Sequence, residues 1–208
     1  HQRGPDFERK AVRDALLKDL RQRTEVDQRL EQIHFVVFSG DLAFSGQPAE
    51  YQTAAKELLE PILEAAGVPR ERLFMIPGNH DLSRGALRLL GRWLDVFPGL
   101  KEINAALTDP SQRQTLLRPM EGYTEFVRTF YGARAVTEPA CGFLSQFEVR
   151  GISVSVIGMN TAWLSGQRIE NGEVNDFGAL ALGEPQFHDF IQDPVFCKAD
   201  VRIGTLHH

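Results

Sequence analysis

Short apolar segments alternate with amphipathic ones along this chain of 208 residues, and that alternation constrains the fold more than any other feature. Three runs rich in β-branched and aromatic residues predict buried strands at residues 33–38, 73–76 and 201–206. Apolar residues at helical spacing predict helices over residues 7–30, 47–66 and 184–192. Strands that alternate with helices in this way indicate an α/β domain.

Two further segments complete the expected organisation. Residues 143–149 and 152–157 alternate in polarity like paired strands, with Arg150 and Gly151 at the turn between them. Residues from about 82 to 140 are mostly of helical character, which is long for a connection inside a compact domain. We therefore expect one domain over residues 1–208 with a helical insertion at about 82–140.

Polar residues follow three of the predicted strands directly. They are Asp41 after the first, Asn79, His80 and Asp81 after the second, and His207 with His208 after the last. In open α/β sheets the chemistry lies just past the carboxyl ends of the strands, so these side chains are expected to converge. Carboxylate, amide oxygen and imidazole together suit divalent ions such as Mn²⁺, Fe²⁺ or Zn²⁺.

The composition argues against some classes of binding partner. The net charge is −5 and the pI about 5.7, which argues against a general basic surface for long duplex DNA. No apolar run approaches the ~18–20 residues of a membrane span, so no membrane partner is expected. The polar first residues do not read as a signal peptide, and the two cysteines lack zinc-ribbon spacing. Together these features predict a cytoplasmic protein.

The segments Gly40-Asp41 and Gly78-Asn79-His80-Asp81, each after an apolar strand, and the final His207-His208 resemble the calcineurin-like metallophosphoesterase superfamily. That resemblance implies a four-layer α/β/β/α sandwich of two stacked mixed sheets with flanking helices. Asp81, and the absence of a GDxxDRG run, argue against the protein phosphatases of the superfamily. The chain looks more like the bacterial branch that contains cyclic-nucleotide phosphodiesterases and phosphohydrolases.

The resemblance also implies roles for individual residues. Asp41 would bridge two divalent ions, with Mn²⁺ expected first and Fe²⁺ or Zn²⁺ as alternatives. Asn79 and His207 would bind the second ion. His80 would contact the phosphate or protonate the leaving oxygen, and Asp81 would orient His80. A hydroxide that bridges the two ions would then hydrolyse a phosphomonoester or phosphodiester, with diesters such as cyclic nucleotides or nucleic-acid ends favoured.

Two motifs of the family are incomplete in this sequence. No D-x-H occurs near the first residue, where His1 is placed to be the histidine of that motif and a further metal ligand, and the closing GHxH is absent. We therefore expect a domain that is incomplete at both ends. Two alternatives stay open, a DNA exonuclease of the same superfamily and a non-catalytic module with this fold that serves in interaction or sensing. The natural substrate and the oligomeric state are not determined by the sequence.

Two other features have a structural and a functional interpretation. Arg84, Arg88 and Arg92 recur at helical spacing after the Asn79-His80-Asp81 segment, either as a solvated helix face or as a clamp for an extra phosphate. Asn160 and Thr161 follow a strand, either as an ordinary turn or as residues delivered to the site.

Overall fold

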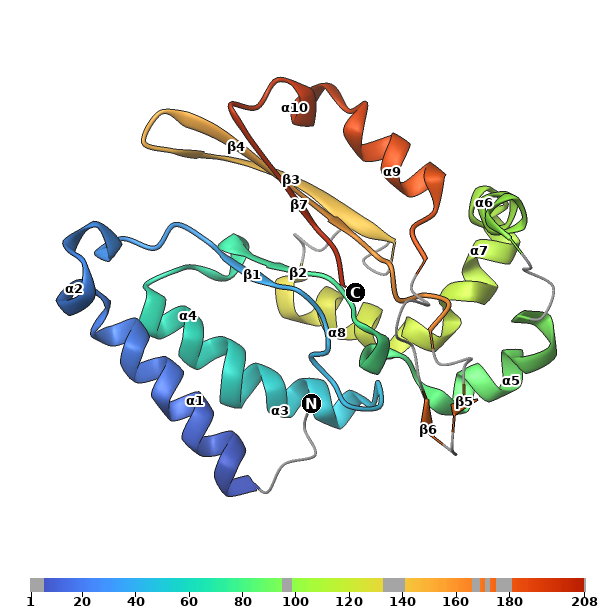
Figure 1. Ribbon diagram of the computed structural model, residues 1–208, viewed down its shortest axis with the longest axis horizontal. Coiled ribbons are helices and arrows are strands. Elements are labelled where there is room, and N and C mark those ends of the chain that lie inside the picture. The colour runs from blue at the N-terminus through green and yellow to red at the C-terminus, as the bar shows by residue number, and fades with distance from the viewer. Residues whose placement is uncertain are drawn as a thin grey trace.

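The computed structural model describes residues 6–94, 99–132, 141–165, 169–170, 173–174 and 181–207, and it has an α/β fold (Figure 1). The helices are α1 (Asp6–Arg21), α2 (Arg23–Val26), α3 (Pro48–Ala54), α4 (Glu60–Ala66), α5 (Arg84–Leu94), α6 (Leu100–Thr108), α7 (Pro110–Leu117), α8 (Glu121–Tyr131), α9 (Glu184–Ile191) and α10 (Pro194–Cys197). The strands are β1 (Val36–Phe38), β2 (Leu73–Met75), β3 (Gly142–Val149), β4 (Ile152–Met159), β5 (Ile169–Glu170), β6 (Glu173–Val174) and β7 (Val201–Thr205).

Two sheets position the site. The first pairs β1 with β2 in parallel, with Val37 opposite Phe74. The second has the order β3-β4-β7, in which β3 and β4 form an antiparallel hairpin and β4 runs parallel to β7. A separate two-stranded ribbon joins β5 to β6. Because β1 and β2 are parallel, the residues that follow them leave the first sheet at the same edge. The residues that follow β4 and β7 likewise share one edge of the second sheet.

The layers of the fold follow from where apolar residues are buried. Between the sheets, Phe74 of β2 packs with Val154 and Val156 of β4. A second core lies between the first sheet and its helices, with Leu63 of α4 and Met75 of β2 among its members. Helices α9 and α10 cover the other sheet and contact β4 (Figure 1). This arrangement confirms the α/β fold with two sheets that the sequence predicts.

The segment expected to be a helical insertion contains α5 to α8 in its described part. Residues of α5, α6 and α7 form a core of their own with Trp163, which is almost completely buried. Helix α8 packs instead against the first sheet. There the hydroxyl of Tyr123 donates to the carbonyl of Met75 at 3.0 Å, and that of Tyr131 donates to the carbonyl of Leu73 at 2.6 Å. That this segment is an insertion in one domain stays a prediction.

The first predicted helix and the first predicted strand differ most from the structure in their bounds. The segment expected as one helix over residues 7–30 consists of α1, which ends at Arg21, then α2 and a 3-10 turn over Gln28–Leu30, and the strand expected from residue 33 begins at Val36. Arg23 explains the break, because its guanidinium donates to the carbonyls of Leu20 at 2.6 Å and of Leu30 at 2.8 Å. The bond to Leu20 satisfies a carbonyl in the last turn of α1, and the bond to Leu30 ties the start of α2 to the segment before β1.

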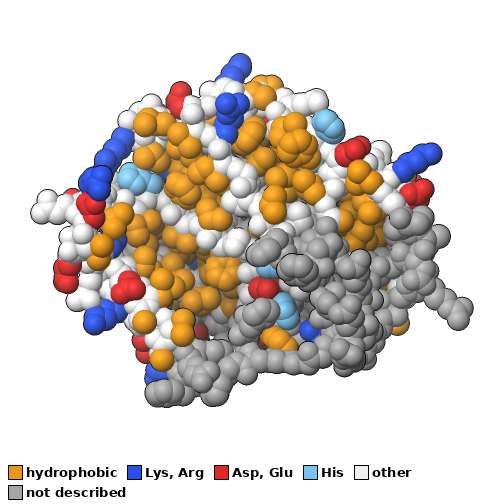
Figure 2. Space-filling model, viewed as in Figure 1, with side chains coloured by type: hydrophobic (Ala, Val, Ile, Leu, Met, Phe, Trp, Pro, Cys, Tyr) orange, Lys and Arg blue, Asp and Glu red, His pale blue; other side chains and the backbone are white. Residues whose placement is uncertain are grey.

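Hydrophobic side chains gather over the two sheets on the face seen in Figure 1, and charged side chains lie mainly around its rim (Figure 2). Within the described ranges, β1 pairs with β2 alone and β7 pairs with β4 alone. Val37 and Val201 on these two strands are exposed. No helix in the described part of the chain has the length and apolar character that a membrane crossing requires.

Candidate metal centre

The turn after β1 brings the Asp41 carboxylate to the edge of the first sheet. Gly40 has a φ of 106° and Asp41 a φ of 60°, so both residues lie in the left-handed region. A Cβ at Gly40 would come within 2.5 Å of His207 Nδ1, which leaves no room for a side chain. A non-glycine residue in this conformation stores strain of about 1 kcal/mol or more. Such strain is typical of functional turns.

The turn after β2 lies against the first one. Asn79 to Asp81 form a single 3-10 turn, and the backbone N–H of His80 donates to Asp41 Oδ1 at 3.0 Å. A Cβ at Gly78 would overlap the Asp41 backbone nitrogen and carboxylate. The absence of a side chain at Gly78 therefore lets the two turns touch.

Asp81 joins the two turns from the inside. Its side chain is completely buried and accepts hydrogen bonds from the backbone N–H groups of Gly78 at 2.8 Å, Ala43 at 2.8 Å and Leu42 at 3.2 Å. Burial raises the pKa of the Asp81 carboxyl to about 6, and the three backbone N–H donors oppose that rise. The neighbouring Asp41 adds to the rise in pKa.

His207 reaches the same place from the second sheet, two residues after β7. Its Nδ1 lies 2.7 Å from the carbonyl oxygen of Ser39, and because a carbonyl only accepts, Nδ1 carries a proton. The hydroxyl of Thr161, which follows β4, donates to the backbone carbonyl of His207. These contacts fix the ring so that Nε2 faces the turns of the first sheet.

Nε2 of His207 lies 3.0 Å from Asn79 Oδ1 and 3.5 Å from Asp41 Oδ1. Both facing atoms are acceptors, and in a neutral ring Nε2 has only a lone pair to present to them. Ligand atoms that each lie about 2.1 Å from one ion stand about 3–3.5 Å apart. Both distances from His207 Nε2 are of the size expected for ligands of one divalent cation, and the Nδ1–H contact selects the tautomer that such a cation needs.

The donor set in the described residues is small. Among the residues that the structure describes, no group of three or more His, Cys, Asp or Glu side chains is placed to hold a metal ion. We expect an amide oxygen, that of Asn79, to complete a set of three with Asp41 and His207. His1, the further ligand expected from the sequence, and His208 lie outside the described residues.

His80 lies beside this cluster with its ring held by Phe44. The Nδ1–H donates to the Phe44 carbonyl at 3.1 Å, and the two rings stack with centroids 5.4 Å apart and an interplanar angle of 26°. The hydrogen bonds of Asp81 join it to backbone nitrogens instead. These contacts give no support to the expectation that Asp81 orients His80, which stays a prediction.

Comparison with known proteins agrees with this arrangement. The model of the calcineurin-like phosphoesterase family matches residues 8–130. The chain belongs to that family. It is also 28% identical over 174 residues to a protein of Bacillus subtilis (strain 168) named "Uncharacterized metallophosphoesterase-like protein YydB". The match covers 83% of this chain and 34% of the relative, so the chain spans about a third of the relative's length. No solved structure matches the chain.

Members of the calcineurin-like phosphoesterase family use divalent metal ions, which agrees with the fit of the three ligand atoms. Sequence reasoning missed Ser39 and Phe44, which act on His207 and His80 through backbone carbonyls. Every residue type supplies a carbonyl, so the sequence contains no signal for these two contacts. Asn160 is buried, and its Oδ1 accepts from the N–H of Ala162 at 2.8 Å. This contact agrees with the interpretation of Asn160 as part of an ordinary turn.

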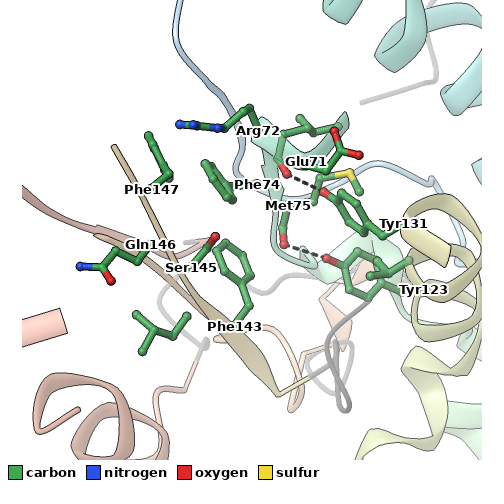
Figure 3. A pocket seen from close by; sticks show the side chains of 13 residues that line it. Glu71, Arg72, Phe74, Met75, Tyr123, Tyr131, Phe143, Ser145, Gln146 and Phe147 are labelled. Atoms are coloured by element: carbon green, nitrogen blue, oxygen red, sulfur yellow. Dashed lines mark hydrogen bonds between the residues drawn. The ribbon is translucent and has the colours of Figure 1, made fainter. Parts of the chain in front are cut away.

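A separate cavity of about 550 Å³ lies between β2, α8 and β3 (Figure 3). Phe74 forms its aromatic wall by stacking on Phe143 and Phe147, with ring centroids 5.8 Å and 5.4 Å apart. Asp41, Asn79, His80 and His207 are not among the residues that line it. In this calcineurin-like phosphoesterase chain, the aromatic cavity and the candidate metal centre are therefore different places.

Proposed function

We propose that this chain is the catalytic domain of a metal-dependent phosphoester hydrolase that prefers phosphodiesters, such as cyclic nucleotides or nucleic-acid ends. The observation that carries the proposal is the meeting of Asp41, Asn79 and His207 from the ends of three strands, with His80 next to them. Family membership supports the general reaction class. The preference for diesters, Mn²⁺ as the metal and a cytoplasmic location are finer points of the proposal.

Different residues of the chain would bind the metal and act on the substrate. Asp41, Asn79 and His207 would hold the metal, with Asp41 shared between two ions when a second is bound. When bound, divalent ions supply positive charge to the phosphoryl oxygens and lower the pKa of water. Nδ1 of His80 carries a proton that it donates to the Phe44 carbonyl. Protonated at Nε2, His80 donates to a phosphoryl or leaving oxygen.

Hydrolysis of bis-p-nitrophenyl phosphate and of p-nitrophenyl phosphate tests the proposal. The assay uses the full natural chain with added Mn²⁺, beside a His80→Ala variant. We expect diester turnover that stops on chelation and falls by a factor of about 10²–10⁴ in the variant, the usual contribution of a positioned acid or base. His188→Ala is the matched control, because His188 is exposed on α9 away from the centre. It should retain turnover.

Absence of turnover on both esters, in folded protein with metal bound, would contradict the proposal and favour a non-catalytic module. Turnover of the monoester alone would contradict the diester preference but not the reaction class.

A further inference from the structure

Arg84 lies next to the candidate centre in an arrangement that the proposed reaction does not yet use. It is the first residue of α5, four residues after His80, and its side chain is exposed. Its guanidinium carbon lies 5.7 Å from the centre of the Phe44 ring, within the range of a cation–π contact. The same ring stacks on His80 at 5.4 Å. Phe44 therefore links Arg84 to the residue proposed to act on the leaving oxygen.

The N–H groups of the Arg84 guanidinium are available for a ligand. In the described ranges it has neither a hydrogen bond nor an ion pair, and its recorded contact is with the face of Phe44. Other arginines differ, because Arg29 pairs with Asp27 at 2.6 Å and Arg70 pairs with Glu60 at 2.5 Å. Stacking on an aromatic ring restrains a guanidinium without consuming its N–H groups, which match phosphate oxygens in pairs.

Given the proposed function, we infer that Arg84 binds a second phosphate of the substrate, one that flanks the phosphate being hydrolysed. Arg84 and His80 each contact Phe44, so an aromatic ring is their common neighbour. A sugar between the two phosphates would place one of them at His80 and the other at Arg84. The substrate class is then an ester with a nucleoside between two phosphates, as at the end of an oligonucleotide.

A pair of esters that differ by one phosphate tests this inference. They are thymidine 5′-(p-nitrophenyl phosphate) with a 3′-hydroxyl and the same compound with a 3′-phosphate. The measurement is the ratio of kcat/KM for the two esters with Mn²⁺, using the full natural chain. We expect the native protein to prefer the 3′-phosphorylated ester, through a lower KM. In Arg84→Ala that preference should fall about tenfold, as for loss of one charge-assisted hydrogen bond.

Two variants serve as controls. Arg84→Lys keeps the charge but not the paired donors, so it should restore only part of the preference. Arg202→Ala removes another exposed arginine, near the start of β7, and should leave the ratio as in the native protein. Turnover of the 3′-hydroxyl ester shows that each variant is folded.

The outcomes separate the inference from the function on which it rests. An unchanged ratio in Arg84→Ala, an equal loss on both esters, or no preference in the native protein would overturn the role of Arg84 while leaving the hydrolase in place. No turnover of either ester by the native protein would overturn the proposed function, and the inference with it.

Discussion

Asp81 shows how one side chain can hold two loops together. Its two oxygens accept from backbone N–H groups on both the turn after β1 and the turn after β2, with no exposure to solvent. The two turns carry Asp41 and Asn79, so their relative position depends on this carboxylate. The contribution of Asp81 visible in the structure is therefore to the geometry of the centre.

Asp81→Asn should lower the free energy of unfolding by about 1–3 kcal/mol. The amide keeps one acceptor oxygen but turns an NH₂ group toward a buried backbone N–H, which then has no partner. Urea unfolding monitored by circular dichroism measures the change. Asp189→Asn, an exposed position on α9, is the control and should change stability by no more than about 0.5 kcal/mol. Equal effects of the two substitutions would contradict this role.

At the scale of elements, α8 lies along the edge of β2 where a further strand of the first sheet would otherwise pair. The carbonyls of Leu73 and Met75, two residues apart, point to the same edge of β2. Both accept from tyrosine hydroxyls of α8, which Figure 3 shows beside the aromatic cavity. Tyr123 is 1% exposed, so the carbonyl it binds has little access to water.

Tyr123→Phe should lower the free energy of unfolding by about 1–2 kcal/mol, because the Met75 carbonyl loses its partner in a buried place. Tyr131→Phe should cost less, since Tyr131 is only partly buried and water can replace its hydroxyl. Urea unfolding of the two variants gives the comparison. A smaller loss of unfolding free energy for Tyr123→Phe than for Tyr131→Phe would contradict the role of Tyr123 at the edge of β2.

At the scale of the whole molecule, the candidate metal centre joins the two sheets. Asp41 and Asn79 belong to the first, and His207 belongs to the second. Contacts of His207 with Ser39 and Thr161 already bring the strand ends together. A cation held by all three ligands would add a link that the unfolded chain lacks, and so would stabilise the folded state.

Mn²⁺ at about 100 times its dissociation constant should therefore raise the melting temperature by about 5–10 °C over chelated protein, from about 2.7 kcal/mol of linkage. Thermal unfolding with and without chelator measures the shift. His207→Ala should lose most of the shift, whereas His188→Ala should retain it. The same Mn²⁺ response in both variants would place the metal elsewhere.

Much of this arrangement is predictable from the sequence. Apolar runs gave the strands, and the hairpin turn lies at Arg150 and Gly151, both at positive φ. The closeness of the turns that carry Asp41 and Asn79 was also predictable, because carboxyl ends of parallel strands share an edge, whereas His207 comes from the other sheet. Where side chains override local pattern the prediction was wrong, as at Arg23, whose guanidinium bonds the Leu20 carbonyl at the end of α1.

The sequence by itself determined which polar side chains follow the strands, since the hydrophobic pattern shows where each strand lies and where it ends. Only the tertiary structure decided how those side chains are held. The tautomers of His80 and His207 depend on the carbonyls of Phe44 and Ser39, and backbone carbonyls are the same in every residue. The contact of Arg84 with Phe44 likewise arises from packing between a loop and a helix, which no spacing in the sequence encodes.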